Sequence, residues 1–189
     1  MVTAARVAGR WRQSTRTVYV VLAGVALMAL AAKVQVPFWP VPMTLHTLAV
    51  MAFAVAFGPR LAVSIFLAYV AAGVAGLPVF SGSPERGFGL AYLAGPTGGY
   101  LAGFLVASWL VARLASGRAM FGRLGAMLAG LGVVYAFGLA WLALYVPVDR
   151  LLAVGVAPFL LGDLVKIGLV ALGARLLPGV RNGSGRASR

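Results

Sequence analysis

The chain has 189 residues, of which 62% are hydrophobic and only 10% are charged, a composition far more apolar than that of a soluble globular domain. It contains no cysteine, one histidine and three acidic residues, which excludes disulfides and argues against a metal or catalytic centre built from His, Cys and carboxylate clusters. At about 20 residues per span, the length allows roughly six membrane-spanning helices and leaves no room for a separate aqueous domain.

The net charge of +13 raises the question of nucleic acid binding, because clustered Lys and Arg neutralise phosphates. Here the basic residues fall between apolar runs, and the basic ends carry no interleaved aromatic platform beyond Trp11. We therefore expect these charges to determine membrane topology, and we expect no nucleic acid partner.

Apolar runs separated by glycine, proline and charged residues predict an all-α integral membrane protein with six transmembrane helices. Residues 1–16 are expected to form a basic cytoplasmic N-terminus, residues 17–177 the transmembrane domain, and residues 178–189 a disordered basic tail. The predicted spans are 17–36, 43–58, 60–77, 95–115, 123–145 and 155–177.

The first apolar run has an alternative interpretation as a cleaved signal peptide, because arginines precede it and Ala29-Leu30-Ala31 resembles a cleavage site. The run is long for a signal, however, and the six-span arrangement uses it to place both termini on one side. We therefore treat it as the first span.

The basic residues segregate to one side of this arrangement, which the positive-inside rule assigns to the cytoplasm. Both termini are then cytoplasmic, as expected for a multi-pass protein of the cytoplasmic membrane. The opposite side receives Lys33, Arg86, Arg150 and Lys166 together with every acidic residue, Glu85, Asp149 and Asp163. The cytoplasmic set is Arg6, Arg10, Arg12, Arg16, Arg60, Arg113, Arg118, Arg123, Arg175, Arg181, Arg186 and Arg189.

The first external loop, from Lys33 to Thr44, contains three prolines within six residues and the aromatic pair Phe38 and Trp39. Prolines make such a segment stiff and extended. It is either an interfacial aromatic belt or a rigid lid over an apolar ligand.

A second external loop, from Leu77 to Ala94, is longer than most connections, and such loops are usually functional or disordered. Its Arg86 offers a planar fork to a ligand carboxylate. A solvated charge paired with Glu85 is the alternative. The loop also carries Phe80 and Tyr92.

Small residues recur at i, i+4 spacing on the fourth predicted span, at Gly95, Gly99, Gly103 and Ala107, and on the third span, at Ala68, Ala72 and Gly76. This pattern lets another helix approach to backbone contact. We interpret both stripes as packing surfaces, inside the bundle or toward a partner.

The last span carries Asp163 and Lys166, which share one helix face because they are three residues apart. Ionisable groups at membrane depth are costly and tend to face a cavity or a partner. Two interpretations remain open at this stage. The pair is either a mutual ion pair that makes the helix tolerable or part of a ligand site.

ATP hydrolysis would need a glycine-rich phosphate loop with lysine, and neither Lys33 nor Lys166 follows one. Serine-nucleophile chemistry lacks a base, because Ser64 and Ser108 lie toward mid-span whereas His46 lies near an outer end. We therefore expect no enzymatic activity, no cofactor and no metal.

Four motifs occur in order along the chain, Pro42-Met43-Thr44-Leu45-His46-Thr47-Leu48, Gly76-Leu77-Pro78-Val79-Phe80, Gly95-Pro96-Thr97-Gly98-Gly99-Tyr100 and Gly162-Asp163-Leu164-Val165-Lys166. With these motifs the chain resembles the BioY family of biotin transporters over about residues 17–177. The family usually has glutamine at the position of His46, and the alanines of the first span are spaced by three, whereas substrate-binding components tend to have them at i, i+4.

The resemblance implies a six-helix substrate-binding component of an energy-coupling factor transporter that captures biotin from outside. Its implied partners are a transmembrane coupling subunit and two ATP-binding-cassette ATPases, with the bilayer around it. A component for another vitamin, an intramembrane enzyme and a membrane scaffold are the alternatives. The expected substrate-binding residues are Asp163, Lys166, Arg86, Tyr92, Phe38, Trp39, Thr44, His46 and Phe80.

Within this expectation, Asp163 accepts hydrogen bonds from the two N–H groups of the biotin ureido ring, because a carboxylate is their natural acceptor. Lys166 lies one helical turn away and reaches the ureido carbonyl or the valerate carboxylate. Arg86 is the alternative partner of that carboxylate.

Overall fold

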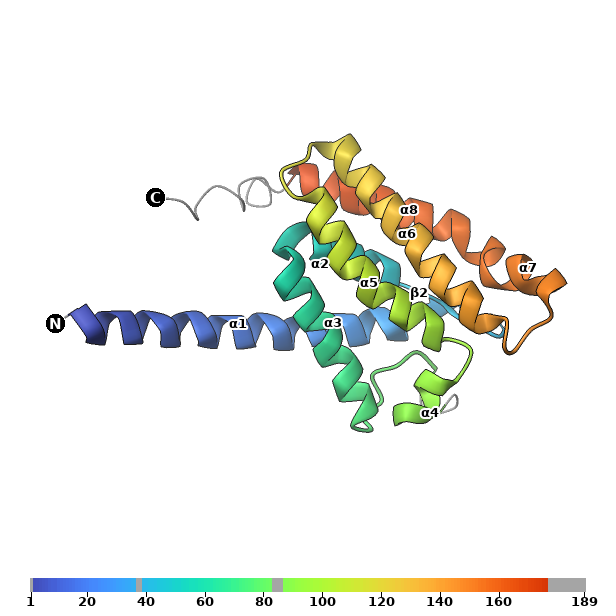
Figure 1. The fold of residues 1–189 in the computed structure, drawn as a ribbon, viewed down its shortest axis with the longest axis horizontal. Helices are drawn as coiled ribbons and strands as arrows, with labels where there is room; N and C mark the ends of the chain where they lie inside the picture. Colours follow the sequence, from blue (N-terminus) through green and yellow to red (C-terminus); the bar gives the residue numbers. More distant parts are fainter. Residues whose placement is uncertain (1, 37–38, 83–86, 177–189) are drawn as a thin grey trace.

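The computed structural model describes residues 2–36, 39–82 and 87–176, and within them the side chains of residues 15–175. This part of the chain is predominantly helical, and six helices form a bundle (Figure 1). They are α1 (Val2–Lys33), α2 (His46–Phe57), α3 (Pro59–Val74), α5 (Gly98–Ala115), α6 (Met120–Leu142) and α8 (Ala157–Leu176).

Each bundle helix coincides with one predicted span to within a few residues, apart from α1, which begins at Val2 and therefore starts well before the predicted span. Four helical segments among the described residues are long and apolar enough to cross a membrane, namely Thr15–Lys33, Gly98–Ala115, Met120–Leu142 and Val148–Arg175. The other two, α2 and α3, are apolar but shorter, at 12 and 16 residues. A helical, multi-pass membrane protein is therefore supported.

The expectation of an all-α protein is wrong in one detail. Between α1 and α2 the chain forms a short antiparallel ribbon of β1 (Gln35–Val36) and β2 (Met43–Thr44), with Gln35 opposite Thr44. Prolines at 37, 40 and 42 keep this segment out of the helical conformation. Gln35 and Val36 pair with Thr44 and Met43 across the ribbon instead. Three short helices complete the connections, α4 (Gly89–Ala94), the 3₁₀ helix η1 (Val148–Arg150) and α7 (Leu151–Gly155).

The connections between the bundle helices lie at two opposite ends of the bundle. The ribbon, α4, η1 and α7 gather at one end, here called the loop end, and the α2–α3 and α5–α6 turns with the last residues of α8 form the other, the turn end (Figure 1). The start of α1 lies on the same side as the turn end. Among the described side chains, Arg60, Arg113, Arg118, Arg123 and Arg175 belong to the turn end, and Asp149 to the loop end.

Helices α5 and α6 lie antiparallel and in close contact, and the small-residue stripe of α5 makes this possible. A Cβ atom added to Gly99 would lie 2.2 Å from Trp141 Cβ, and one added to Gly103 would lie 2.8 Å from Val134 Cα. The predicted packing surface is therefore confirmed on α5. Of the corresponding stripe, Ala68 and Ala72 on α3 are half-buried, whereas Gly76 lies beyond the end of α3 and is exposed, with no atom within 4 Å of such a Cβ.

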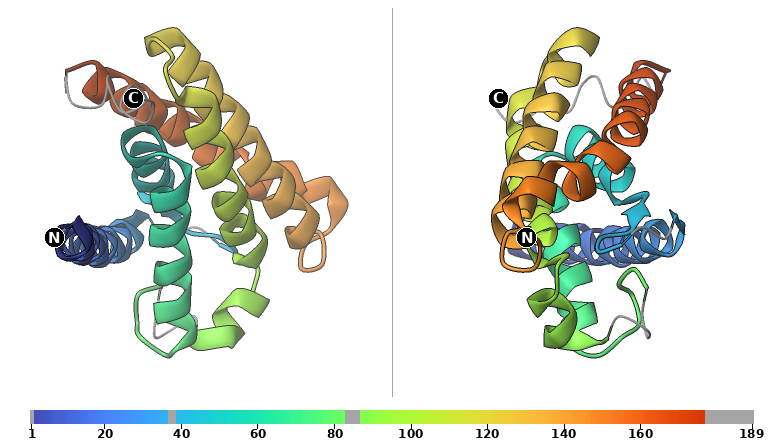
Figure 2. Two further views of the ribbon diagram at one scale, coloured as in Figure 1. Left: turned by 60° about the vertical axis from the view of Figure 1, so that its left-hand side comes forward. Right: turned by 90° about the vertical axis from the view of Figure 1, so that its right-hand side faces the viewer.

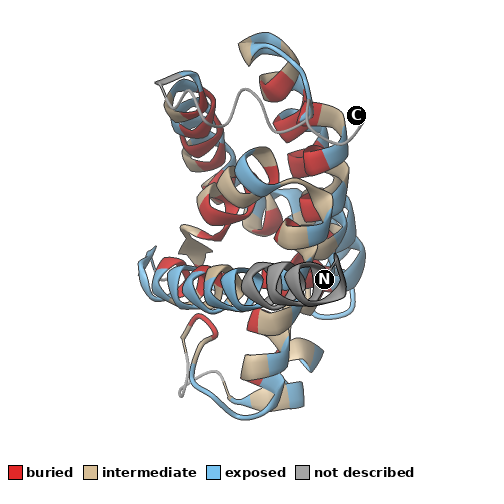
Figure 3. Ribbon diagram, turned by 90° about the vertical axis from the view of Figure 1, so that its left-hand side faces the viewer, coloured by how far each residue is buried: buried red, intermediate tan, exposed pale blue. Residues whose placement is uncertain are grey.

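From residue 15 to its end, helix α1 packs against α2, α3 and β2 on one side, and its other side is exposed (Figure 3). Its contact with α3 is close, because a Cβ added to Gly24 would lie 2.7 Å from Ile65 Cγ2. The outward side of α1 is apolar, with Tyr19, Leu22 and Leu30 all more than half exposed. Such a surface suits a lipid environment, where apolar side chains have no water to avoid.

Candidate functional site: a polar cavity at the loop end

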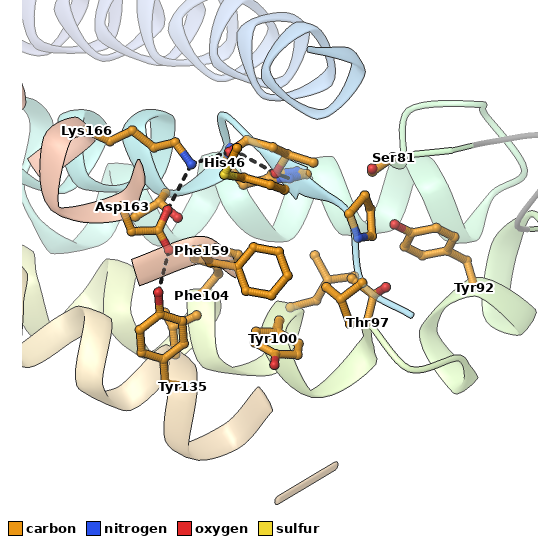
Figure 4. A pocket seen from close by; sticks show the side chains of 17 residues that line it. His46, Ser81, Tyr92, Thr97, Tyr100, Phe104, Tyr135, Phe159, Asp163 and Lys166 are labelled. Carbon is orange, nitrogen blue, oxygen red and sulfur yellow. Dashed lines mark hydrogen bonds and ion pairs between the residues drawn. The ribbon is translucent and has the colours of Figure 1, made fainter. Parts of the chain in front are cut away.

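A cavity lies beneath the ribbon, between β2, α2, α5, α6 and α8 (Figure 4). The space accessible to the centre of a water molecule is about 50 Å³, which is enough for only a few waters. Its wall combines aromatic rings, among them Tyr100, Phe104 and Phe159, with a small number of polar side chains. This mixture is typical of sites for small molecules.

The ion pair Asp163–Lys166 forms one end of the cavity. Lys166 Nζ donates to Asp163 Oδ1 at 2.9 Å, and both residues are at least nine-tenths buried, with exposed fractions of 7% and 5%. Their spacing of three residues on α8 places both side chains on the cavity face of the helix. A buried ion pair requires further hydrogen bonds to offset the cost of desolvation.

Those further hydrogen bonds come from two other elements. Tyr135 on α6 donates from its hydroxyl to Asp163 Oδ2 at 2.9 Å. Lys166 Nζ also donates to the backbone carbonyl of Thr44 at 2.6 Å, which ties α8 to the ribbon strand β2. Both carboxylate oxygens and the ammonium are thus engaged, and the pair links three separate elements of the fold (Figure 4).

His46, the first residue of α2, lies beside this pair in the cavity wall and is 5% exposed. Its Nδ1 lies 2.9 Å from Thr44 Oγ1, and its Nε2 lies 2.9 Å from the Tyr69 hydroxyl. Tyr69 in turn donates to the Val79 carbonyl at 3.3 Å. A neutral imidazole with its proton on Nε2 is consistent with all these hydrogen bonds. His46 Nε2 then donates to the Tyr69 hydroxyl, and the Thr44 hydroxyl donates to Nδ1.

Polar groups at the opposite end of the cavity come from the α3–α4 connection, from α4 and from the residue that precedes α5. Ser81, Tyr92 and Thr97 line this end and lie away from Lys166 in Figure 4. Ser81 Oγ donates to Gln35 Oε1 at 2.6 Å, which connects the ribbon to the α3–α4 segment. The cavity therefore has a charged end and a second, neutral polar end.

Of the substrate-binding residues predicted from the sequence, Thr44, His46, Tyr92, Asp163 and Lys166 line this cavity. Phe80 lies behind the wall, stacked on Tyr92 with ring centroids 4.6 Å apart, and it is 1% exposed. Trp39 is 82% exposed and is not among the lining residues. Phe38 and Arg86 lie outside the described residues.

Sequence reasoning missed Tyr135, which touches the carboxylate directly. A tyrosine in an apolar span resembles ordinary core, so only the position of α6 relative to α8 reveals its role. Tyr100 belongs to one of the four sequence motifs but was not predicted to be a site residue. Its hydroxyl donates to the Gly155 carbonyl at 2.8 Å, which fixes α5 against α7 next to the cavity.

The fold and the cavity define a class: a helical membrane protein with a cavity of aromatic and polar side chains beneath the loops at one end. The sequence model of the BioY family matches residues 3–182. The chain belongs to the BioY family.

Individual relatives agree with this assignment. A probable biotin transporter BioY from Pyrococcus horikoshii is 36% identical over 155 residues, which cover 82% of this chain and 91% of the relative. The biotin transporter BioY from Thermotoga maritima is 36% identical over 149 residues, covering 78% and 86%. A crystal structure of the S-component for biotin from an ECF-type ABC transporter superposes with a TM-score of 0.76 at 25% identity, covering 87% of this chain and 92% of that one.

Proposed function

We propose that this protein binds biotin and takes it up across the cytoplasmic membrane as the substrate-specific component of an energy-coupling factor transporter. The observation that carries the proposal is the loop-end cavity, which combines aromatic rings with the Asp163–Lys166 pair, in a chain of a family whose relatives are biotin transporters. The ligand is transported and not converted, so the protein is not an enzyme.

The two ends of the cavity suit the two ends of biotin. The ureido ring offers two N–H donors and a carbonyl, which match Asp163 as acceptor and Lys166 as donor. The aromatic wall of Tyr100, Phe104 and Phe159 suits the apolar ring and chain. The valerate carboxylate then extends either to Lys166 or to the end with Ser81, close in sequence to Arg86.

The free space within this cavity is small, about 50 Å³, so we infer that the segments around it move when biotin enters. The two loop-end segments that bound the cavity, the ribbon and the α3–α4 connection, are joined by the hydrogen bond from Ser81 to Gln35. Lys166 is held to the ribbon through the Thr44 carbonyl. We infer that binding exchanges the hydrogen bonds within the site for hydrogen bonds to the ligand.

The proposal includes six transmembrane helices with both termini in the cytoplasm and the loop end outside. The grouping of arginines at the turn end supports this orientation. Single cysteines provide a test, because the chain has none of its own. An impermeant thiol reagent added to intact cells should label Val148→Cys, at the exposed loop end, and not Ser116→Cys, in the α5–α6 turn. The reverse labelling pattern would invert the topology.

A transmembrane coupling subunit and ATP-binding-cassette ATPases are the proposed partners, because the sequence contains no phosphate-binding loop of its own. The structural neighbour is itself described as the biotin component of an ECF-type ABC transporter. Energised uptake by this chain accordingly depends on ATP hydrolysis by another subunit.

The direct test of the proposed function is equilibrium binding of radiolabelled biotin to the purified protein. We expect saturable binding of one biotin per chain, displaced by unlabelled biotin and not by other vitamins such as thiamine or riboflavin. A folded protein that binds no biotin, or that binds another vitamin more tightly, would refute the assignment.

A further inference from the structure

A second cavity lies at the turn end, between the start of α6 and the end of α8, far from the biotin site. The two helices diverge toward this end in both views of Figure 2, and the cavity between them has a volume of about 400 Å³. Three arginines line it, Arg118 from the α5–α6 turn, Arg123 from α6 and Arg175 from α8.

The three arginines are held in different ways. Arg123 is 7% exposed, and its Nη1 donates to the Ala174 carbonyl at 3.2 Å, which connects α6 to the last turn of α8 across the floor of the cavity. Arg118 and Arg175 are exposed at the rim. Because guanidinium remains protonated in proteins, the cavity carries fixed positive charge at any physiological pH.

None of the acidic residues of the chain belongs to the α5–α6 turn, to α6 or to the last turn of α8. The three acidic residues are Glu85, Asp149 and Asp163. Asp163 is paired with Lys166 in the biotin site, Asp149 lies in η1 at the loop end, and Glu85 lies between α3 and α4 in the sequence. Of the three arginines, Arg118 and Arg175 are exposed at the rim, so an anion from outside the protein is a natural counter-charge for these two.

Apolar features next to the arginines indicate what kind of anion fits. Phe121 lines the same cavity and is 81% exposed, which is the position of an aromatic side chain at headgroup depth. A groove of about 270 Å³ lies between α2 and α8, and Ala174 lines both the groove and the basic cavity. The groove is lined only by Leu, Val, Ala and Gly, so it suits an acyl chain and offers nothing to a soluble anion.

We propose that the turn-end cavity binds the phosphate headgroup of an anionic phospholipid, with one acyl chain along the α2–α8 groove. Basic pockets between helix ends at the cytoplasmic surface are a recognised form of lipid site, and anionic lipids concentrate in that leaflet. The assignment to that leaflet rests on the proposed topology, whereas the site itself does not. Lipid bound here would bridge α6 and α8 at the end where they diverge.

The test compares lipid binding to the full chain, measured by native mass spectrometry with phosphatidylglycerol and phosphatidylcholine of the same acyl composition. The wild-type protein should retain one phosphatidylglycerol in preference to phosphatidylcholine. In R118Q/R175Q, which keeps the buried Arg123, the affinity for phosphatidylglycerol should fall about thirtyfold, which corresponds to about 2 kcal/mol or about 1 kcal/mol per basic residue.

The matched control is R60Q/R113Q, which removes the same two charges from exposed positions at the same end but outside the cavity. It should keep the wild-type preference. Equal affinities for the two lipids, or an equal loss in both double variants, would overturn the proposal. Displacement of the lipid by millimolar inorganic phosphate would assign the cavity to a free anion and also overturn it.

A protein occupant is distinguished in the same series. If R118Q/R175Q binds phosphatidylglycerol as the wild type does but no longer copurifies with the coupling subunit, the arginines belong to a protein interface and the lipid assignment is wrong. Biotin binding by R118Q/R175Q confirms that the variant is folded, because the biotin site lies at the other end of the bundle.

Discussion

Helix α8 contributes to two charged cavities that are organised in opposite ways. At the loop end, the positive charge of Lys166 is balanced by Asp163 within the same helix, and every partner is supplied by the chain. At the turn end, Arg118, Arg123 and Arg175 gather around a larger cavity to which the chain contributes no acidic side chain.

The difference separates two ways of presenting charge to a ligand. A balanced, buried pair is stable when closed, and it recognises a neutral hydrogen-bonding group by exchanging its internal bonds for bonds to the ligand. A basic cavity without acidic side chains attracts anions without any rearrangement of the protein. The strength of this attraction depends on the surface potential of the membrane and on the ionic strength. The first arrangement suits selective capture, and the second suits a permanent lipid contact.

The largest expected effect comes from breaking the balanced pair. Asp163→Asn and Lys166→Met should each weaken biotin binding by about a hundredfold or more, about 2.7 kcal/mol or above, because each leaves a buried charge without its partner. Binding of radiolabelled biotin to the purified variants measures the loss. Asp149→Asn, at an exposed position, is the control and should change little. Near-wild-type affinity in both folded variants would make the pair purely structural.

A tenfold effect is expected when the carboxylate loses its support from α6. Tyr135→Phe removes the hydroxyl that donates to Asp163 Oδ2, and a hydrogen bond to a charged group contributes about 1.5–3 kcal/mol. We expect affinity for biotin to fall about tenfold, about 1.4 kcal/mol, with the bundle intact by circular dichroism. Tyr19→Phe, on the exposed side of α1, serves as the control. No difference between the two variants would show that Tyr135 does not position the carboxylate.

A smaller effect is expected at His46, which is not charged in the hydrogen-bond arrangement described above. His46→Gln retains one donor and one acceptor for Tyr69 and Thr44, so biotin affinity should change no more than about threefold, below about 0.7 kcal/mol. His46→Leu removes both and should weaken binding further. Equal affinities in these two variants, measured in the same binding assay, would contradict a polar role for this position.

The smallest effect on biotin binding is expected from substitutions in the turn-end cavity. R118Q/R175Q should bind biotin within about twofold of the wild type, about 0.4 kcal/mol, because these exposed arginines lie at the opposite end from Asp163. Titration with labelled biotin in the presence and absence of phosphatidylglycerol checks the independence of the two sites. A loss of biotin affinity that appears only when the lipid is removed would instead show that the two ends are coupled.

The positions of the bundle helices were predictable because long apolar runs and the spacing of arginines depend on the membrane and not on tertiary contacts. The ribbon of β1 and β2 was not predicted, since two-residue strands carry no periodic signal and form only when the chain returns on itself. Trp39 was expected in the site on the basis of its neighbours in the sequence, yet its side chain is exposed.

The sequence by itself determined the class of protein, the family and the unusual pair Asp163 and Lys166, because composition, motif order and the cost of burying charge are properties that a one-dimensional chain already carries. The tertiary structure alone decided which groups meet that pair, since Thr44 and Tyr135 approach it from separate elements. It also decided that Arg175 of α8 lines one cavity with Arg118 and Arg123, from which it is distant in the sequence. Such contacts depend on the crossing of α6 and α8, which no local pattern encodes.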